Sequence, residues 1–212
     1  LKTGESKDLT PAEGVKAGLV AGDRDVPNEI VVGLNDRDPR YHDLYVLEVD
    51  SGELRLLYRN TDDGRNVGVE WVDGAWHPVL RSQILADGSR SYELRLPGNK
   101  DWRPFLTFGF EDTMGASEVS GFTRDGQWLY GSLSTGEDLP RLVRWSREQL
   151  RTCGTTCEPE LVHRSSTGAL GVALSDINTG EPTVLQEVDL RSRRVVLDPS
   201  VQPDLNALNK LA

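Results

Sequence analysis

The chain has 212 residues, 37% of them hydrophobic and 27% charged, and a formal net charge of -10. This acidic balance argues against nucleic acid as a partner, because binding phosphates requires clustered lysine and arginine. No apolar run approaches the roughly 20 residues that a membrane-spanning helix needs, so we expect no membrane partner either. The chain is long enough to bury a hydrophobic core, and its sequence indicates no cofactor.

Strand patterns are clearest between Asn28 and Asn60. An apolar run at residues 30–34 precedes a charged turn, a second run at 43–49 alternates apolar and polar residues, and a third run follows at 54–58. Short apolar runs separated by turns that contain glycine or aspartate predict an antiparallel meander.

This pattern recurs along the chain. Turns at Asp73-Gly74, Asp125-Gly126 and Thr179-Gly180 each separate a glycine-containing run from a bulkier one, at spacings of 52 and 54 residues. Units of this length cannot bury both faces alone and stack as β-propeller blades. We therefore predict an all-β fold, a β-propeller segment of about four four-stranded antiparallel blades, open or closed by oligomerisation. A β-sandwich is the alternative, but it gives no reason for a fixed period.

The same turns set the predicted boundaries. The units are residues 1–10 (the end of a blade), 11–60, 61–112, 113–166 and 167–198, followed by a short C-terminal helix at 199–212. In the last unit, residues 184–188 and 194–197 are assigned as the third and fourth strands. A strand from Ser6 to Leu9 could complete that unit and close the array. A second short helix is predicted at residues 147–151.

Cys153 and Cys157 are the only cysteines. Their spacing fits a small disulfide loop in an exported protein or two free thiols in a cytosolic one. The compartment stays open between cytoplasmic and periplasmic or secreted, and a bonded pair would favour export. A metal site is not expected here, because the nearest histidine, His163, stands alone.

The charged turn of the first unit is specific. The string GLNDRDPRYHDLY, from Gly33 to Tyr45, with the strand and Ser-Gly-Glu turn that follow, resembles the N-terminal propeller of bacterial serine peptidases of the prolyl oligopeptidase family, particularly acylaminoacyl-peptidase and dipeptidyl-peptidase-like members. LTPAEGVKA near the start and VLDPSVQPDLNAL near the end also look like that propeller.

This resemblance implies a non-catalytic propeller domain that gates peptide access to an α/β-hydrolase domain of the same parent protein. The implied partners are that domain and, transiently, peptides. The hydrolase domain would carry a G-x-S-x-G nucleophile elbow, a motif that is absent from this sequence. The chain itself is therefore not expected to be an enzyme, whereas the parent is expected to be a serine peptidase.

The charged turn also supplies the candidate site, an interface or gating hinge formed by Asp36, Arg37, Asp38, Arg40 and His42. These side chains could line a substrate path or meet the hydrolase domain. The alternative is a solvated turn whose ion pairs contribute about 0 to 1 kcal/mol each, or a clamp between blades. No catalytic residue is predicted, because the sequence pairs no nucleophile with a base and an orienting group.

A second function remains open, a free-standing propeller scaffold for protein–protein interaction. Open blade edges could also pair with another copy of the chain and form a homo-oligomer. A propeller glycosidase would need two carboxylates that converge on a pocket, and none is identified. The five tryptophans are expected to fill the wedges between adjacent blades.

Overall fold

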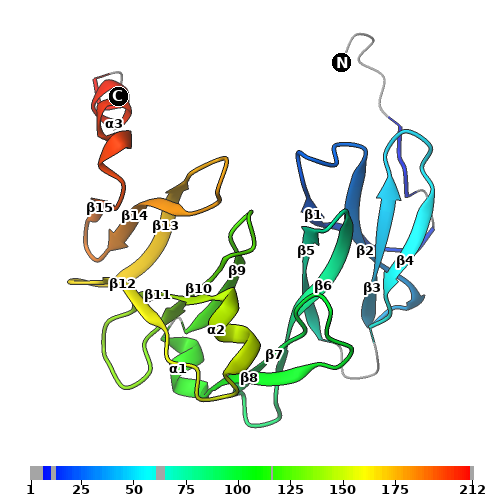
Figure 1. Cartoon of the computed structure of the whole chain (residues 1–212), viewed down its shortest axis with the longest axis horizontal. Coiled ribbons are helices and arrows are strands. Elements are labelled where there is room, and N and C mark those ends of the chain that lie inside the picture. Colours follow the sequence, from blue (N-terminus) through cyan, green and yellow to red (C-terminus); the bar gives the residue numbers. More distant parts are fainter. Residues whose placement is uncertain (1–6, 11–12, 61–64, 116, 211–212) are drawn as a thin grey trace. The chain divides into compact units, whose positions relative to one another are not determined.

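A computed structural model describes residues 7–10, 13–60, 65–115 and 117–210 (Figure 1). Four antiparallel sheets follow one another along the chain, and each connects strands that are neighbours in sequence. This confirms the predicted all-β fold of successive blade-like sheets. No helix among the described residues is long and apolar enough to cross a membrane.

The strands of the four sheets are as follows. The first sheet holds β1 (Ala17–Gly22), β2 (Glu29–Asp38), β3 (Tyr41–Glu48) and β4 (Leu54–Tyr58). The second sheet holds β5 (Asn66–Val72), β6 (Ala75–Ile84), β7 (Arg90–Leu94) and β8 (Arg103–Phe108). The third sheet holds β9 (Glu118–Phe122), β10 (Trp128–Leu133), β11 (Arg141–Ser146) and β12 (Glu160–Arg164). The fourth sheet holds β13 (Ala169–Ser175), β14 (Pro182–Val188) and β15 (Ser192–Val196).

Helices are short. They are α1 (Phe110–Met114), α2 (Arg147–Thr152), the 3-10 turn η1 (Pro199–Val201) and α3 (Gln202–Leu208). The helices predicted at residues 147–151 and after 198 are both present in the described residues. The Ser146 hydroxyl caps α2 by accepting a hydrogen bond from the Gln149 amide at 3.1 Å.

The three predicted glycine turns all join the first strand of a sheet to the second. In the β5–β6 hairpin, Asp73 and Gly74 both have positive φ, at 51° and 74°. A two-residue hairpin turn of this hand requires positive φ at both positions, which explains the Asp-Gly pair. Gly126 and Gly180 supply positive φ at the equivalent turns of the third and fourth sheets.

The predicted opening strand is wrong where the structure describes it. Ser6 lies outside the described residues, as do the other residues at positions 1–6, and residues 7–10 form no strand. The Asp8 carboxylate accepts a hydrogen bond from the Thr10 amide at 2.9 Å, which folds the backbone into a local turn. Leu9 packs on an apolar cluster of the first sheet that contains Val32 and Leu47.

The strand order predicted for the last unit is also corrected. Residues 184–188 belong to β14, which is the second strand of the fourth sheet, and β15 is the third. No fourth strand follows among the described residues. Asp198 ends the extended chain because its carboxylate accepts from the Ser200 amide at 2.9 Å, and Pro199 begins a helical turn.

The chain divides into two compact units. The first unit is Leu1–Gln83 with Glu93–Trp102, and the second unit is Ile84–Tyr92 with Arg103–Ala212. In the first unit, Trp76 of the second sheet packs on Val31 and Val46 of the first sheet. This contact is the wedge between sheets that was predicted for tryptophan.

The second unit has its own core. Trp145 of the third sheet is completely buried, and its ring lies edge-on to Phe105 of the second sheet, with the ring centroids 5.2 Å apart. Tyr130 and Leu142 of the third sheet form a cluster with Leu185 of the fourth. Apolar side chains therefore join consecutive sheets within each unit.

Gly131 of β10 permits the close packing around Trp145. A Cβ atom there would lie 2.8 Å from the Glu118 carbonyl oxygen and 3.1 Å from the Trp145 ring. We expect Gly131→Ala to lower the free energy of unfolding by about 1 to 3 kcal/mol through overpacking, measured by urea denaturation. Gly121→Ala in neighbouring β9 is the control, because its Cβ would meet no atom within 4 Å. Equal effects of the two substitutions would contradict this prediction.

Candidate functional site

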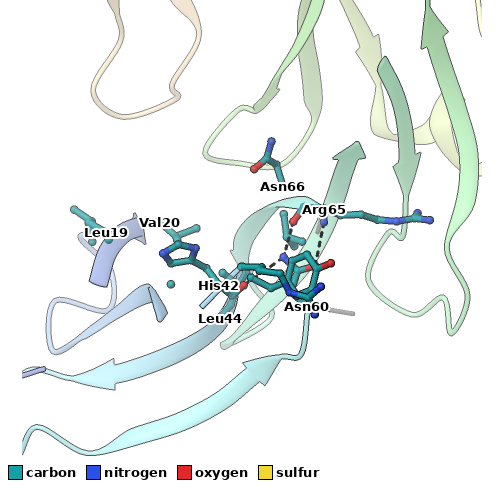
Figure 2. A pocket seen from close by; sticks show the side chains of 12 residues that line it. Leu19, Val20, His42, Leu44, Asn60, Arg65 and Asn66 are labelled. Atoms are coloured by element: carbon teal, nitrogen blue, oxygen red, sulfur yellow. Dashed lines mark hydrogen bonds between the residues drawn. The ribbon is translucent and has the colours of Figure 1, made fainter. Parts of the chain in front are cut away.

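A pocket of about 360 Å³ lies beside the β2–β3 turn in the first unit (Figure 2). Leu19 and Val20 of β1 form an apolar part of its lining, and Arg40, His42 and Arg65 contribute polar groups. The turn that the sequence singled out therefore borders a cavity. Of the predicted hinge residues, Arg40 and His42 are part of the lining.

Asp38 and Arg40 form a local ion pair at this turn. Arg40 donates from Nη2 to Asp38 Oδ2 at 2.8 Å and from Nε to Oδ1 at 3.1 Å, and its guanidinium carbon lies 4.9 Å from the centre of the Tyr41 ring. The hydrogen bonds from Arg40 lower the pKa of Asp38 to about 2. The Arg40 side chain is nevertheless 70% exposed, so it stays accessible at the edge of the pocket.

Asp36 has a different partner. The Tyr45 hydroxyl donates to its carboxylate, with oxygen–oxygen distances of 3.0 and 3.1 Å. Burial raises the pKa of Tyr45, and the hydrogen bond to Asp36 raises it further. Asp36 therefore ties the turn to the body of β3.

Arg37 is directed toward a buried carboxylate that the sequence prediction did not include. Its Nε and Nη2 atoms donate to the two oxygens of Asp43, at 2.7 and 2.9 Å. The Asp43 side chain is only 1% exposed. Burial alone would raise the pKa of Asp43, but hydrogen bonds from Arg37 and from the Asn60 amide lower it overall.

Asn60 connects this ion pair to the start of the second sheet. Its amide nitrogen donates to Asp43 Oδ1 at 2.8 Å, and its carbonyl oxygen accepts from Arg37. Its side chain accepts from the Arg65 amide at 3.1 Å and donates to the Arg65 carbonyl at 2.7 Å. We call Arg37, Asp43 and Asn60 the Asp43 network. It holds β2, β3 and the segment before β5 together.

The residues of the predicted hinge therefore fall into two groups in the structure. Asp36, Arg37 and Asp38 have partners within the first sheet and its connection, whereas Arg40 and His42 border the pocket. Sequence reasoning missed Asp43 and Asn60. One signal was available for Asp43, because a charged residue that begins an apolar alternation at a strand's inner face requires a buried partner.

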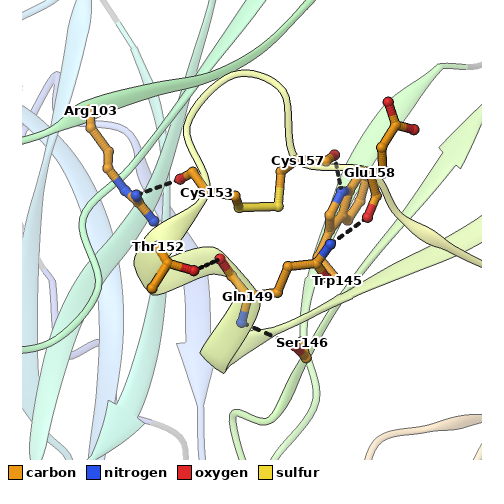
Figure 3. The surroundings of a disulfide bond; sticks show 8 residues. All are labelled: Arg103, Trp145, Ser146, Gln149, Thr152, Cys153, Cys157 and Glu158. Atoms are coloured by element: carbon orange, nitrogen blue, oxygen red, sulfur yellow. Dashed lines mark hydrogen bonds between the residues drawn. A yellow bond between two sulfur atoms is a disulfide. The ribbon is translucent and has the colours of Figure 1, made fainter.

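The two cysteines are bonded (Figure 3). The disulfide joins the C-terminal end of α2 to the loop before β12, across a sequence separation of 4. Arg103 of the second sheet donates to the Cys153 carbonyl at 2.7 Å, and the Trp145 ring nitrogen donates to the Cys157 carbonyl at 3.0 Å. The disulfide loop thus presents backbone acceptors to two side chains of the second unit, the buried Trp145 and the partly buried Arg103.

A second buried carboxylate lies in the second unit. Glu187 of β14 has a fully buried side chain, and it contacts His163 Nε2 at 2.7 Å, Arg193 Nη2 at 2.5 Å and the Ser166 hydroxyl at 3.1 Å. We call these four residues the Glu187 network. Because His163 belongs to β12 and Ser166 to the connection that follows it, the network joins the third sheet to the fourth.

The Glu187 network does not have the geometry of a catalytic triad. Ser166 and His163 both bond to the same carboxylate, and the described residues show no hydrogen bond from that hydroxyl to that ring. A nucleophilic serine needs the base itself as its hydrogen-bond partner. Within the described part of the chain, no group of three or more histidine, cysteine, aspartate or glutamate residues could hold a metal ion.

Successive antiparallel sheets joined by aromatic wedges and buried carboxylates define the class of the chain, a segment of blade-like sheets of the propeller kind. No protein-family model matches it. It is similar over its whole length to dipeptidyl aminopeptidase BIII of Pseudoxanthomonas mexicana, with 30% identity over 211 residues, which are 100% of this chain and 29% of that protein.

Dipeptidyl peptidase family member 6 of Caenorhabditis elegans is 23% identical over 136 residues, which cover 61% of this chain and 18% of that protein. These matches confirm the predicted resemblance to dipeptidyl-peptidase-like proteins and relate the chain to peptidases. The chain spans less than a third of the length of either relative.

The Asp43 network gives a prediction about stability. Asp43→Asn keeps the side-chain size but removes the buried carboxylate charge that accepts two hydrogen bonds from Arg37. We expect the free energy of unfolding to fall by about 2 to 3 kcal/mol, at the low end for a broken buried ion pair because the Arg37 side chain is 33% exposed. Urea denaturation measures the change, with the exposed Asp36→Asn as control. A loss below that of the control would show that the network contributes little.

The Glu187 network predicts a pH dependence. Burial would raise the pKa of Glu187, but hydrogen bonds from His163, Arg193 and Ser166 outweigh it and lower this pKa from the ordinary 4.5 to about 2. A carboxyl group with a lowered folded-state pKa stabilises the fold above its unfolded pKa, and this stabilisation is lost as the pH falls.

We therefore expect Glu187→Gln to be less stable than the parent at pH 7 and to lose less stability between pH 4.5 and pH 2. Urea midpoints across this range measure the slope, and the exposed Glu53→Gln serves as control. The prediction fails if Glu187→Gln and the parent chain have the same slope.

Proposed function

We propose that the chain is the non-catalytic propeller domain of a dipeptidyl-peptidase-like serine peptidase of the prolyl oligopeptidase family. In this role it would limit which peptides reach an α/β-hydrolase domain of the same parent protein. The observation that carries the proposal is that the whole chain, which folds as successive antiparallel sheets, matches 29% of the length of a dipeptidyl aminopeptidase.

The chemistry of the described residues supports a non-catalytic role. The printed sequence contains no G-x-S-x-G elbow, and Ser166 and His163 are arranged around Glu187 as structural partners. Most of the length of both relatives lies outside the matched segment. A catalytic domain in that remaining length would account for the peptidase names of the relatives.

The structure also suggests how such a domain could filter peptides. The Asp43 network fixes the β2–β3 turn, so Arg40 and His42 are held at a rigid pocket edge. A rigid edge excludes bulky substrates by size, whereas motion of the whole domain relative to a catalytic domain would admit the smaller ones.

The first test compares two proteins, the 212-residue chain and the full-length product of the same gene. We expect the chain alone to release no product from chromogenic dipeptidyl and acyl-peptide substrates, and the full-length product to hydrolyse at least one of them. Turnover by the chain in preparations free of contaminating peptidases would contradict the non-catalytic role. A full-length product without peptidase activity would instead favour the free-standing scaffold.

The second test addresses gating in the full-length product. Replacing both Arg40 and His42 by alanine removes bulk from the pocket edge. This double substitution should raise kcat/KM for a ten-residue peptide relative to kcat/KM for a dipeptidyl substrate. We expect a ratio change of roughly five-fold, equivalent to about 1 kcal/mol. Arg55→Ala is the control, because this arginine is 63% exposed on β4 and does not line the pocket. An unchanged ratio in the double variant would exclude this turn from the gate.

A further inference from the structure

Two arginines contact the Trp102 ring in the first unit. The guanidinium carbons of Arg81 and Arg95 are each 4.6 Å from the centre of its ring. The Tyr58 ring meets Trp102 edge-on, with the ring centroids 6.1 Å apart and the planes at 85°. The cluster therefore combines two cations with two aromatic rings, and its residues are only partly buried. Tyr58 ends β4 and Arg81 lies within β6, whereas Arg95 directly follows β7 and Trp102 directly precedes β8.

The Arg81 guanidinium donates three hydrogen bonds within this cluster. Its Nε and Nη2 atoms donate to the two oxygens of Glu93, at 2.8 and 3.2 Å, and Nη1 donates to the Tyr58 hydroxyl at 3.3 Å. Arg65 forms an ion pair with the same Glu93 carboxylate. Glu93 is therefore the anionic partner of two arginines, Arg65 and Arg81.

Arg95 is the other arginine that contacts the Trp102 ring. It donates a long hydrogen bond of 3.4 Å from Nη2 to the Pro78 carbonyl, and no carboxylate of the described residues forms an ion pair with it. A guanidinium carries several further N–H donors. Burial lowers the pKa of Arg95 overall; the nearby Tyr58 hydroxyl acts to raise it, and the positive charge of Arg81 acts to lower it. In a chain with a net charge of -10, a partly buried cation that has no anionic partner among the described residues is unusual and costs free energy.

We propose that Arg95 binds the carboxylate of a peptide, with Trp102 and Tyr58 packing against the side chain next to it. A guanidinium matches a carboxylate in a planar, two-pronged hydrogen bond, which favours this anion. The aromatic rings favour an apolar neighbour of the carboxylate. The choice of a peptide as the ligand rests on the proposed function, whereas the need for an anion rests on the cluster itself.

The carboxylate could belong to the C-terminus of the peptide or to an aspartate or glutamate side chain. Three peptides distinguish these sources: Ala-Ala-Ala-Leu with a free C-terminus, the same peptide as its C-terminal amide, and Ala-Ala-Glu-Leu amide. Each is titrated into the 212-residue chain and followed by tryptophan fluorescence, with inorganic phosphate as a further probe. We expect at least one of the two carboxylate-bearing peptides to bind about tenfold more tightly than Ala-Ala-Ala-Leu amide.

Variants assign the binding to the cluster. Arg95→Gln should weaken binding of the preferred peptide about tenfold, and Arg95→Lys should restore it only in part because an ammonium lacks the two-pronged geometry. Trp102→Phe should remove most of the fluorescence change. Arg55→Gln on β4 is the matched control and should bind like the parent chain. Far-ultraviolet circular dichroism shows whether each variant is folded.

Three results would overturn the inference. They are equal affinity for the amide and for both carboxylate peptides, binding that is unchanged in a folded Arg95→Gln variant, and binding of phosphate without binding of any peptide. Hydrolysis of dipeptidyl substrates by the full-length product is measured separately. Active full-length protein combined with absent carboxylate binding would therefore contradict this site and leave the proposed function intact.

Discussion

The buried carboxylate of Asp43 is the constraint on which the first unit depends. Apolar contacts such as that of Trp76 with the first sheet supply most of the free energy for packing two sheets, but they are non-directional. Asp43 can be buried as an anion only if Arg37 and the Asn60 amide reach it together. The sheet and the segment that begins its neighbour are therefore held in one relative arrangement, and the neighbouring pocket acquires a fixed edge.

In the second unit a buried carboxylate again fixes the arrangement of neighbouring elements, with different residues. Glu187 is as deeply buried as Asp43, and both carboxylates have one partner in their own sheet and one in a connection between sheets. Glu187 has a further partner, His163, in the adjacent third sheet. Apolar side chains again form the larger contact, around Tyr130 and Leu185. A stack of repeated sheets needs such directional contacts, because each sheet presents similar apolar faces to its neighbours and could otherwise slide. In both units a charged residue fixes the position that the apolar residues leave undetermined.

Short-range features of the fold were predictable, and long-range polar contacts were not. The turns at Gly74, Gly126 and Gly180 follow from local backbone requirements, and the strand order of the second and third sheets could be derived from the first two of them. The error at residues 7–9 has a local cause, since Asp8 bonds to a nearby amide and overrides the strand pattern. Asn60 and His163, by contrast, bond to carboxylates 17 and 24 residues away. No periodicity identifies such partners, so both networks emerged only from the structure.

The charged turn and Arg95 show that the residues with the strongest sequence signature need not be those of the proposed carboxylate site. Asp36, Arg37 and Asp38 each have a hydrogen-bonding partner within the first sheet, so the richest motif in the sequence is explained largely by what the hairpin needs to keep its shape. Arg95 belongs to no recognisable motif, yet it is the arginine of the Trp102 cluster without a carboxylate among the described residues. An internal ion pair has little capacity left for a ligand, whereas an uncompensated cation gains most from one. The carboxylate site that we propose is therefore placed at the second sheet and not at the charged turn.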